Sequence, residues 1–334
     1  MTPEQTNLRL GLAGFTADQQ ESVHAALQSR PPSAAAWEIV PFTEADAWWV
    51  HGARTVPMPD GTLRVNPGKP SGRSVLLDLS DIDRPLAFAR PVPAAPFDAA
   101  SFDLEDPVQV AAMLDRFSGW LQPLTAQFCL AASLLEQHAA LGTGSFHVLQ
   151  GPQLIAVVNM RGDAGVLPTA TTVDFEEALW RRSPQSNPPI PEQFARLSLS
   201  QLMWQFAQRS TRDLLPPHYR TGLLYFRRPP RLPQRLMRDA HLLLLRELAT
   251  GCGTMEELQA RTGMASTQIS RDLAALYLVG AITSNPKRAA AGATKRLETN
   301  DSLLSAPPSL PSAAAPRAGP VNPDLTAPAP LRNT

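Results

Sequence analysis

The sequence predicts an α/β fold in the N-terminal part of the chain, a mixed α+β region in the middle and a further α+β unit near the C-terminus. Three observations support this prediction. Strand-like and helix-like segments alternate at the start, amphipathic helices alternate with hairpins in the middle, and three short helices separated by glycine turns follow residue 238. We expect these parts to span residues 1–122, 123–230 and 231–300.

Composition limits the classes of protein to consider. The 334 residues suffice for two or three domains, and 18% charged with 43% apolar residues is typical of a globular chain. The 34 prolines are about twice the average frequency and predict stiff loops between the elements. The net charge of zero favours no partner, so a charged binding surface must come from the way the charges are distributed.

The cysteines and the hydropathy of the chain indicate its compartment. Cys129 and Cys252 lack the spacing of a disulfide framework or a zinc knuckle, which suits a reducing cytosol. The first residues show no basic segment followed by an apolar one, and no apolar run approaches the roughly 18 residues of a membrane span. We therefore expect a cytoplasmic protein with no membrane partner.

The first part of the chain has the alternating pattern of an α/β sheet. A strand, a helix and a second strand are followed by a helical stretch that carries Trp48 and Trp49, a hairpin that turns at Asp60-Gly61, and two further core strands. The predicted elements are Leu8–Ala13, Ala17–Ser29, Trp37–Phe42, Thr43–Val50, Arg54–Val65, Ser74–Leu79 and Leu86–Ala89.

The apolar strand that ends in Asp78 and Leu79 resembles the phospho-acceptor strand of response-regulator receiver domains, in which an aspartate follows a buried strand. The resemblance implies a receiver-like α/β fold over residues 8–120. Gly14-Phe15-Thr16 stands where receivers hold magnesium with an acidic pair, and Arg90 stands where they have a lysine. The implied module is a degenerate receiver, or pseudo-receiver. The alternative for Asp78 is a strand-end residue that caps a turn.

Helices and hairpins follow the α/β part. Asp106-Pro107 begins a helix with apolar residues at helical spacing, and Gly151-Pro152 turns a hairpin. The predicted elements are Val108–Leu121, Leu124–Leu141, Phe146–Leu149, Leu154–Asn159, a short helix that Thr172 or Asp174 caps and that reaches Trp180, Leu199–Ser210 and the strand Leu223–Phe226. The two long helices are the expected surface of a homodimer, although packing within the chain explains them equally well.

Three short helices are predicted near the C-terminus, over Asp239–Thr250, Met255–Arg261 and Thr267–Val279. Thr254 and Glu257 have the spacing of a capping box before the second helix, and Gly263 supplies the left-handed residue that ends it. Ser266 is the expected N-cap of the third helix. The inner face of that helix is apolar and comprises Ile269, Leu273 and Leu276.

This layout resembles the winged helix-turn-helix family over about 60 residues. The residues that carry the resemblance are Thr254-Met-Glu-Glu-Leu258, Thr262-Gly-Met264, Ser266-Thr-Gln-Ile-Ser-Arg271, Leu273, Leu276 and Gly280-Ala-Ile282. In that family the third helix enters the major groove of DNA, and a wing contacts the backbone or the minor groove. The resemblance therefore implies duplex DNA as the partner and a wing over Ile282–Leu297.

The same resemblance assigns base contacts to the third helix and phosphate contacts to the wing. Gln can pair with adenine and Arg with guanine, whereas phosphates need only cations. The assigned residues are Ser266, Thr267, Gln268, Ser270, Arg271, Lys287, Arg288, Lys295 and Arg296. Residues 231–300 hold ten Lys/Arg against six Asp/Glu, and residues 204–238 hold eight Arg against one Asp, so basic charge gathers here. Asp272 on the same helix would not favour phosphate.

No catalytic, metal or cofactor site is predicted. The six histidines are scattered, and neither the glycine patterns of nucleotide-binding loops nor the nucleophile elbow occurs. From residue 301 the chain is rich in Ser, Ala and Pro, which predicts a disordered tail over residues 301–334.

Two hypotheses for function follow. In the first, the protein is a bacterial transcriptional regulator that binds DNA through its winged helix, while the N-terminal part senses a signal or binds a protein. In the second, it is a signalling adaptor that does not bind DNA, with a pseudo-receiver and a winged helix that docks a protein. The bacterial source is expected from the preference for Arg over Lys, since lysine occurs only at Lys69, Lys287 and Lys295. An enzyme is not expected.

Overall fold

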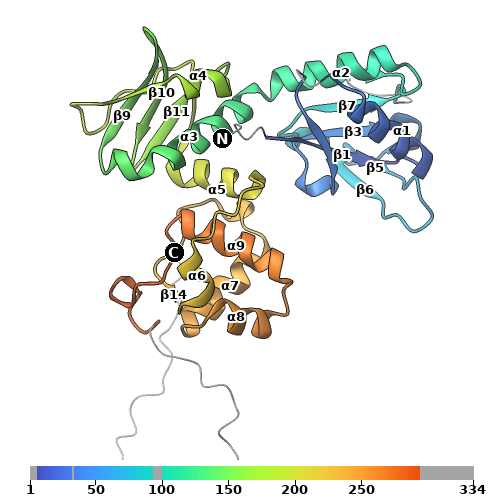
Figure 1. Ribbon diagram of the computed structural model, residues 1–334. Helices are drawn as coiled ribbons and strands as arrows, with labels where there is room; N and C mark the ends of the chain where they lie inside the picture. The colour runs from blue at the N-terminus through green and yellow to red at the C-terminus, as the bar shows by residue number, and fades with distance from the viewer. Residues whose placement is uncertain (1–5, 32–33, 93–99, 294–334) are drawn as a thin grey trace, which may run out of the picture. The chain divides into compact units, whose positions relative to one another are not determined.

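The computed structural model (Figure 1) describes residues 6–31, 34–92 and 100–293. The described residues belong to one compact unit of the chain. Lys295, Arg296 and the predicted tail over residues 301–334 lie outside the described residues, and so does the end of the predicted wing.

A five-stranded parallel sheet organises the N-terminal part. Its strands follow the order β2-β1-β3-β7-β8, and every neighbouring pair is parallel. If these five strands are renumbered 1 to 5 in chain order, their order across the sheet is 2-1-3-4-5, which is that of doubly wound flavodoxin-like sheets. The strands are β1 (Leu8–Ala13), β2 (Trp37–Val40), β3 (Ala47–His51), β7 (Leu86–Ala89) and β8 (Ser101–Phe102). This part is therefore α/β, as predicted.

The two faces of the parallel sheet are covered differently. Helices pack on one face, where Trp49 of β3 meets Phe117 in a buried cluster. A small antiparallel sheet covers the other face, where Val50 and Phe88 meet Leu63. The covering elements are α1 (Ala17–Gln28), α2 (Pro107–Trp120), β4 (Thr55–Pro57), β5 (Thr62–Val65) and β6 (Val75–Asp78). A doubly wound sheet carries helices on both faces, so this part departs from that architecture.

Two N-terminal elements differ from the prediction. The segment expected to be helical, Thr43–Val50, overlaps a short 3-10 turn, η1 (Phe42–Glu44), and the central strand β3. The strand expected as a third core strand is β6, which pairs antiparallel with β5 and lies outside the parallel sheet. A strand buried on both faces is apolar throughout, so a short apolar run cannot be told from a helical one by periodicity.

An antiparallel sheet of order β12-β9-β10-β11-β13 forms the middle of the fold. The hairpin predicted around Gly151-Pro152 is confirmed as β9 and β10. The short helix expected to reach Trp180 ends at Glu176, and Trp180 lies in β12. The elements are α3 (Gln122–Leu141), β9 (Ser145–Gln150), β10 (Gln153–Asn159), β11 (Asp163–Val166), α4 (Thr172–Glu176), β12 (Leu179–Arg182), β13 (Ala195–Ser198) and α5 (Leu199–Arg209).

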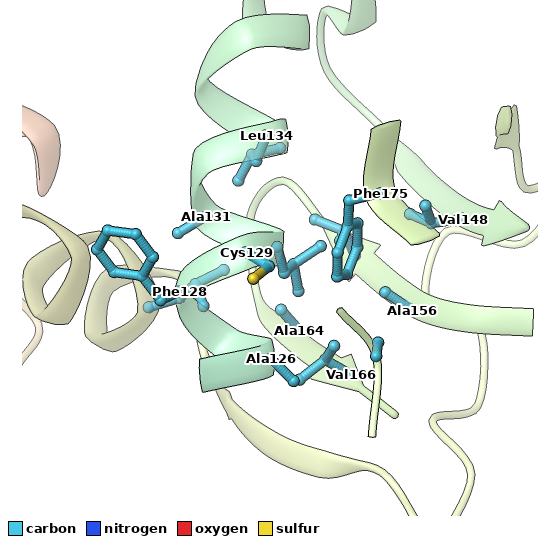
Figure 2. Close-up of a cluster of buried hydrophobic side chains, with 14 of the residues drawn as sticks. Ala126, Phe128, Cys129, Ala131, Leu134, Val148, Ala156, Ala164, Val166 and Phe175 are labelled. Atoms are coloured by element: carbon cyan, nitrogen blue, oxygen red, sulfur yellow. The ribbon is translucent and has the colours of Figure 1, made fainter. Parts of the chain in front are cut away.

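Helix α3 packs on this antiparallel sheet. Figure 2 shows Cys129 of α3 between the helix and the strands, near Ala164 and Phe175. Phe128 lies on another side of α3, and its ring centre is 4.8 Å from that of Phe206 on α5. The long helix predicted here is thus occupied by contacts within the chain on more than one side.

The C-terminal part contains one short helix and three longer helices around a further buried region. Leu248, Leu258 and Leu273 are fully buried there. Trp204 and Ala207 of α5 join this region, while other α5 residues join the core under α3. The elements are α6 (Pro217–Thr221), β14 (Tyr225–Phe226), α7 (Asp239–Thr250), α8 (Met255–Thr262), α9 (Ser266–Leu278), β15 (Ile282–Thr283) and η5 (Pro286–Arg288). Within the described ranges, no helix is long and apolar enough to cross a membrane.

Candidate nucleic-acid interface

Helix α8 has the N-cap and the terminating glycine that the sequence indicated, and it ends at Thr262, one residue after the expected Arg261. The Thr254 hydroxyl accepts a hydrogen bond from the backbone N–H of Glu257 (3.2 Å), and the Glu257 carboxylate accepts one from the N–H of Thr254 (3.0 Å). Gly263 has φ +68°, in the left-handed region, and its N–H donates to the carbonyl of Gln259. Because glycine adopts this conformation without strain, the chain leaves α8 sharply and enters α9 three residues later.

The apolar face of α9 is fixed in the core. Ile269, Leu273 and Leu276 are each fully buried, as the helical spacing predicted. They pack with Leu244 of α7 and Leu258 of α8. With one face held in this way, the residues of α9 that point outward have a defined direction. The N-cap is Ala265 and not the expected Ser266, which is the first residue of the helix.

The five assigned residues of α9 lie in its N-terminal half. Ser266, Thr267 and Arg271 are exposed, while Gln268 and Ser270 are half-buried. Thr267 and Arg271 are one helical turn apart, so their side chains share one side of the helix. The structure thus brings part of the assigned set together on an accessible surface.

Gln268 is engaged within the helix. Its Nε2 donates a hydrogen bond to Oδ2 of Asp272 at 2.9 Å. Reading an adenine with both atoms of the amide would require this bond to be released, because the same Nε2 is the donor in each case.

Asp272 belongs to the core rather than to the outer surface. Its side chain is fully buried, and its Oδ1 lies 3.0 Å from Nη2 of Arg238 and 3.1 Å from Nε2 of His241. Burial opposes ionisation, but hydrogen bonds from His241 and Gln268 and the charge of Arg238 outweigh it, so the pKa of Asp272 lies below its usual value. The repulsion of phosphate expected from this residue is therefore weakened by burial and pairing.

The segment after α9 continues into a short strand and a 3-10 turn. β15 pairs antiparallel with β14, which comes from before the three helices. The chain then forms η5, where the Asn285 side chain accepts a hydrogen bond from the N–H of Lys287 (3.0 Å). Lys287 and Arg288 are both exposed. Two of the four assigned wing residues therefore lie side by side in the described part of the chain.

Several arginines of the basic stretch over residues 204–238 serve the fold. Arg209 forms a bidentate pair with Asp46, Arg212 contacts Glu136 at 3.0 Å, and Arg220 pairs with Asp213. Much of the positive charge counted from the sequence is thus neutralised internally. Sequence reasoning missed these pairs because most of the partners lie far away along the chain.

The aspartate assigned by the receiver resemblance lies at the exposed end of β6. The Asp78 carboxylate accepts hydrogen bonds from the hydroxyl (2.6 Å) and the backbone N–H (2.9 Å) of Ser80, and these bonds lower its pKa. Asp78 thereby caps the 3-10 turn η3 (Leu79–Asp81), which is the alternative interpretation of this residue.

A histidine ends the third strand of the parallel sheet. His51 is buried, and its Nε2 lies 3.2 Å from Nε2 of Gln19 on α1. Burial, followed by the charges of Arg54 and Arg90, lowers the pKa of His51. The neutral imidazole is therefore favoured at this strand end. Within the described residues, no group of three His, Cys, Asp or Glu side chains is arranged to hold a metal ion.

In comparisons with protein-family models, with curated proteins and with solved structures, no match to this chain was found. What the chain does is therefore inferred from its own residues and their geometry.

Proposed function

We propose that this protein is a DNA-binding transcriptional regulator in which α7, α8 and α9 form a winged helix and α9 lies in the major groove. The observation that carries the proposal is the orientation of α9. Its buried face is anchored by Ile269, Leu273 and Leu276, and Thr267 and Arg271 extend from its accessible side. An exposed arginine at that position suits bidentate hydrogen bonding to guanine.

The exposed cations of η5 support the same proposal. Lys287 and Arg288 follow β15 closely, and no carboxylate of the described residues lies within ion-pair distance of either. Phosphate contacts require cations without a fixed geometry. Together with Lys295 and Arg296, these residues would act as the wing, and their contribution would be independent of the DNA sequence.

The test uses the full chain and duplexes selected from a random-sequence pool, with affinity measured by fluorescence anisotropy. Arg271→Ala is expected to weaken binding by about tenfold or more and to relax selection at one base pair, because a bidentate arginine contact is lost. Lys287→Ala is expected to weaken all duplexes similarly and to lower the slope of log affinity against log salt by about one.

Arg64→Ala is the matched control, because Arg64 is exposed on β5 in a different sheet. It should leave both affinity and salt slope unchanged. Failure of the full chain to bind any duplex at low salt would refute the proposal, as would an Arg271→Ala variant that binds like the parent.

The second candidate is an adaptor whose α9 docks a protein. The bond between Gln268 and Asp272 favours it, because it restrains one of the side chains on α9 that is suited to reading bases. Absence of duplex binding at low salt, combined with an Arg271-dependent protein complex, would support the adaptor.

A further inference from the structure

A cleft lined by five arginines lies between the end of α9, the residues that follow β14, and the turn that joins β10 to β11. Its volume is about 930 Å³, which is in the range of small-molecule pockets. The arginines are Arg161, Arg227, Arg228, Arg231 and Arg288.

The positive charge of this arginine cleft is not balanced by the protein. Asp163 is the single carboxylate among the described residues that line it, and Asp163 is already paired with Arg196 at 2.8 Å. Across the described ranges, no carboxylate lies within ion-pair distance of any of the five arginines. Unpaired arginines that share one cleft repel one another unless an anion lies between them.

Three of the arginines, Arg227, Arg228 and Arg231, are close enough to influence each other. Partial desolvation and the charges of Arg227 and Arg231 lower the pKa of Arg228. Gly280, at φ +68°, allows two guanidinium groups to lie against the chain, because a Cβ there would be 3.2 Å from Nη2 of Arg228 and 3.3 Å from Nη1 of Arg227. A side chain at this position would compete with the guanidinium groups for the same space.

Capping of α9 explains only part of this cluster. Nε of Arg228 donates to the carbonyl of Gly280 at 3.3 Å, and a cation near the end of a helix is favourable. This contact does not require Arg161, Arg231 or Arg288, which reach the cleft from positions before β11, after β14 and in η5.

Apolar side chains form part of the remaining wall, together with His138, Ser198 and Ser200. Leu134, Met160, Met203 and Tyr277 line the cleft beside the arginines. Such a wall limits the access of water and strengthens the attraction between guanidinium groups and an anion. The combination of several arginines with an apolar wall is the chemistry of a site for a phosphorylated small molecule.

We propose that the arginine cleft binds a small ligand that carries two or more phosphate groups. A duplex backbone fits the site poorly, because the arginines line a hollow and not a convex ridge. The cleft also lies toward the C-terminal end of α9, beginning at Tyr277, which is roughly 15 Å from Thr267 and roughly 9 Å from Arg271 along a helix that rises about 1.5 Å per residue. The site does not depend on the proposed function, although Arg288 belongs both to the cleft and to the proposed wing.

The test is titration calorimetry of the full chain with inorganic pyrophosphate, without added metal. We expect one site and a thermal unfolding midpoint that rises with pyrophosphate more than with sulfate at equal ionic strength. Replacing Arg228 and Arg231 together by Gln should weaken pyrophosphate binding by at least about tenfold, because two charge-assisted contacts are lost. Arg246→Gln, at an exposed position on α7 outside the cleft, should bind like the parent.

The double variant also reports on folding. Without ligand its unfolding midpoint should stay close to that of the parent, because the reduced repulsion among the arginines offsets the lost contact between Arg228 and the Gly280 carbonyl. Two results would overturn the proposal: no pyrophosphate binding by the parent, or undiminished binding by the folded double variant. DNA binding that depends on Arg271 is a separate measurement, so failure of either proposal can be recognised independently.

Discussion

At the scale of single residues, the buried carboxylate on α9 determines what that helix can offer to a partner. Asp272 accepts hydrogen bonds from His241 and Gln268 and lies 3.0 Å from Nη2 of Arg238. Arg238 also lies 3.8 Å from Glu44, on η1 of the N-terminal part. One aspartate therefore positions groups from α9 and from the start of α7. Removing its carboxylate would leave His241 and Gln268 without the group that accepts their hydrogen bonds.

Asp272→Ala is expected to lower the free energy of unfolding by about 3 kcal/mol, because removal of one partner from a buried charged network leaves the others unpaired. Urea unfolding followed by circular dichroism measures this change. Asp81→Ala, an exposed aspartate in η3, is the control and should stay within about 0.5 kcal/mol of the parent. Equal effects of the two substitutions would contradict the network described here.

The same comparison has a defined dependence on pH. The pKa of Asp272 is lowered in the folded state, so its contribution to stability is present above the ordinary aspartate pKa of about 3.9 and is lost as pH falls through the lower folded value. The stability difference between the parent and Asp272→Ala should therefore shrink in strong acid. A difference that grew as the pH fell would have the wrong sign.

At the scale of elements, the sequence predicted the helices that carry local capping signals. It did not predict the strands whose place depends on pairing with residues far away in the chain. The capping residues of α8 and the proline at the start of α2 were sufficient to locate both helices. By contrast, β3 was predicted as a helix. Trp48 and Trp49 pack on opposite faces of the sheet, so the strand lacks the alternation of apolar and polar residues that would identify it. β6 was assigned to the wrong sheet, since an apolar strand carries no mark of its partner.

Thr254→Ala tests whether the cap of α8 contributes as its geometry indicates. Loss of a side-chain cap costs about 1 kcal/mol, because the N–H of Glu257 loses its acceptor. Urea unfolding should show a decrease of this size. Thr267→Ala is the matched control in α9, where no side-chain cap bond is formed, and it should cost less than about 0.5 kcal/mol. A control that destabilised the protein as strongly would contradict the role of the cap.

At the scale of the whole molecule, function-bearing groups are assembled from segments that the sequence keeps apart. The outer face of α9 was predictable because its residues are neighbours in one helix. The arginine cleft was not, since Arg161 and Arg288 are separated by more than a hundred residues and no local pattern links them. The packing of α5 was not predictable from local pattern either, because its side chains belong to two separate buried clusters.

The contact between α5 and the parallel sheet leads to the last prediction. The Arg209 guanidinium forms a bidentate pair with Asp46, whose Oδ2 also accepts a hydrogen bond from the N–H of Arg9 (2.9 Å). The side chains of Arg209 and Asp46 are 12% and 8% exposed, so water compensates poorly for a lost partner. Arg209→Ala should lower the free energy of unfolding by about 3 kcal/mol.

This loss should also change how the molecule unfolds. Asp46 immediately precedes β3, so without Arg209 the N-terminal sheet loses an anchor on α5 and should unfold at lower urea than the rest of the chain. Tryptophan fluorescence and circular dichroism should then give separate transitions where the parent gives one. Arg196→Ala, which breaks the exposed pair with Asp163, should cost less than about 1 kcal/mol and leave the transitions coincident. Coincident transitions for Arg209→Ala, at the urea midpoint of the parent, would show that this ion pair does not couple the two parts.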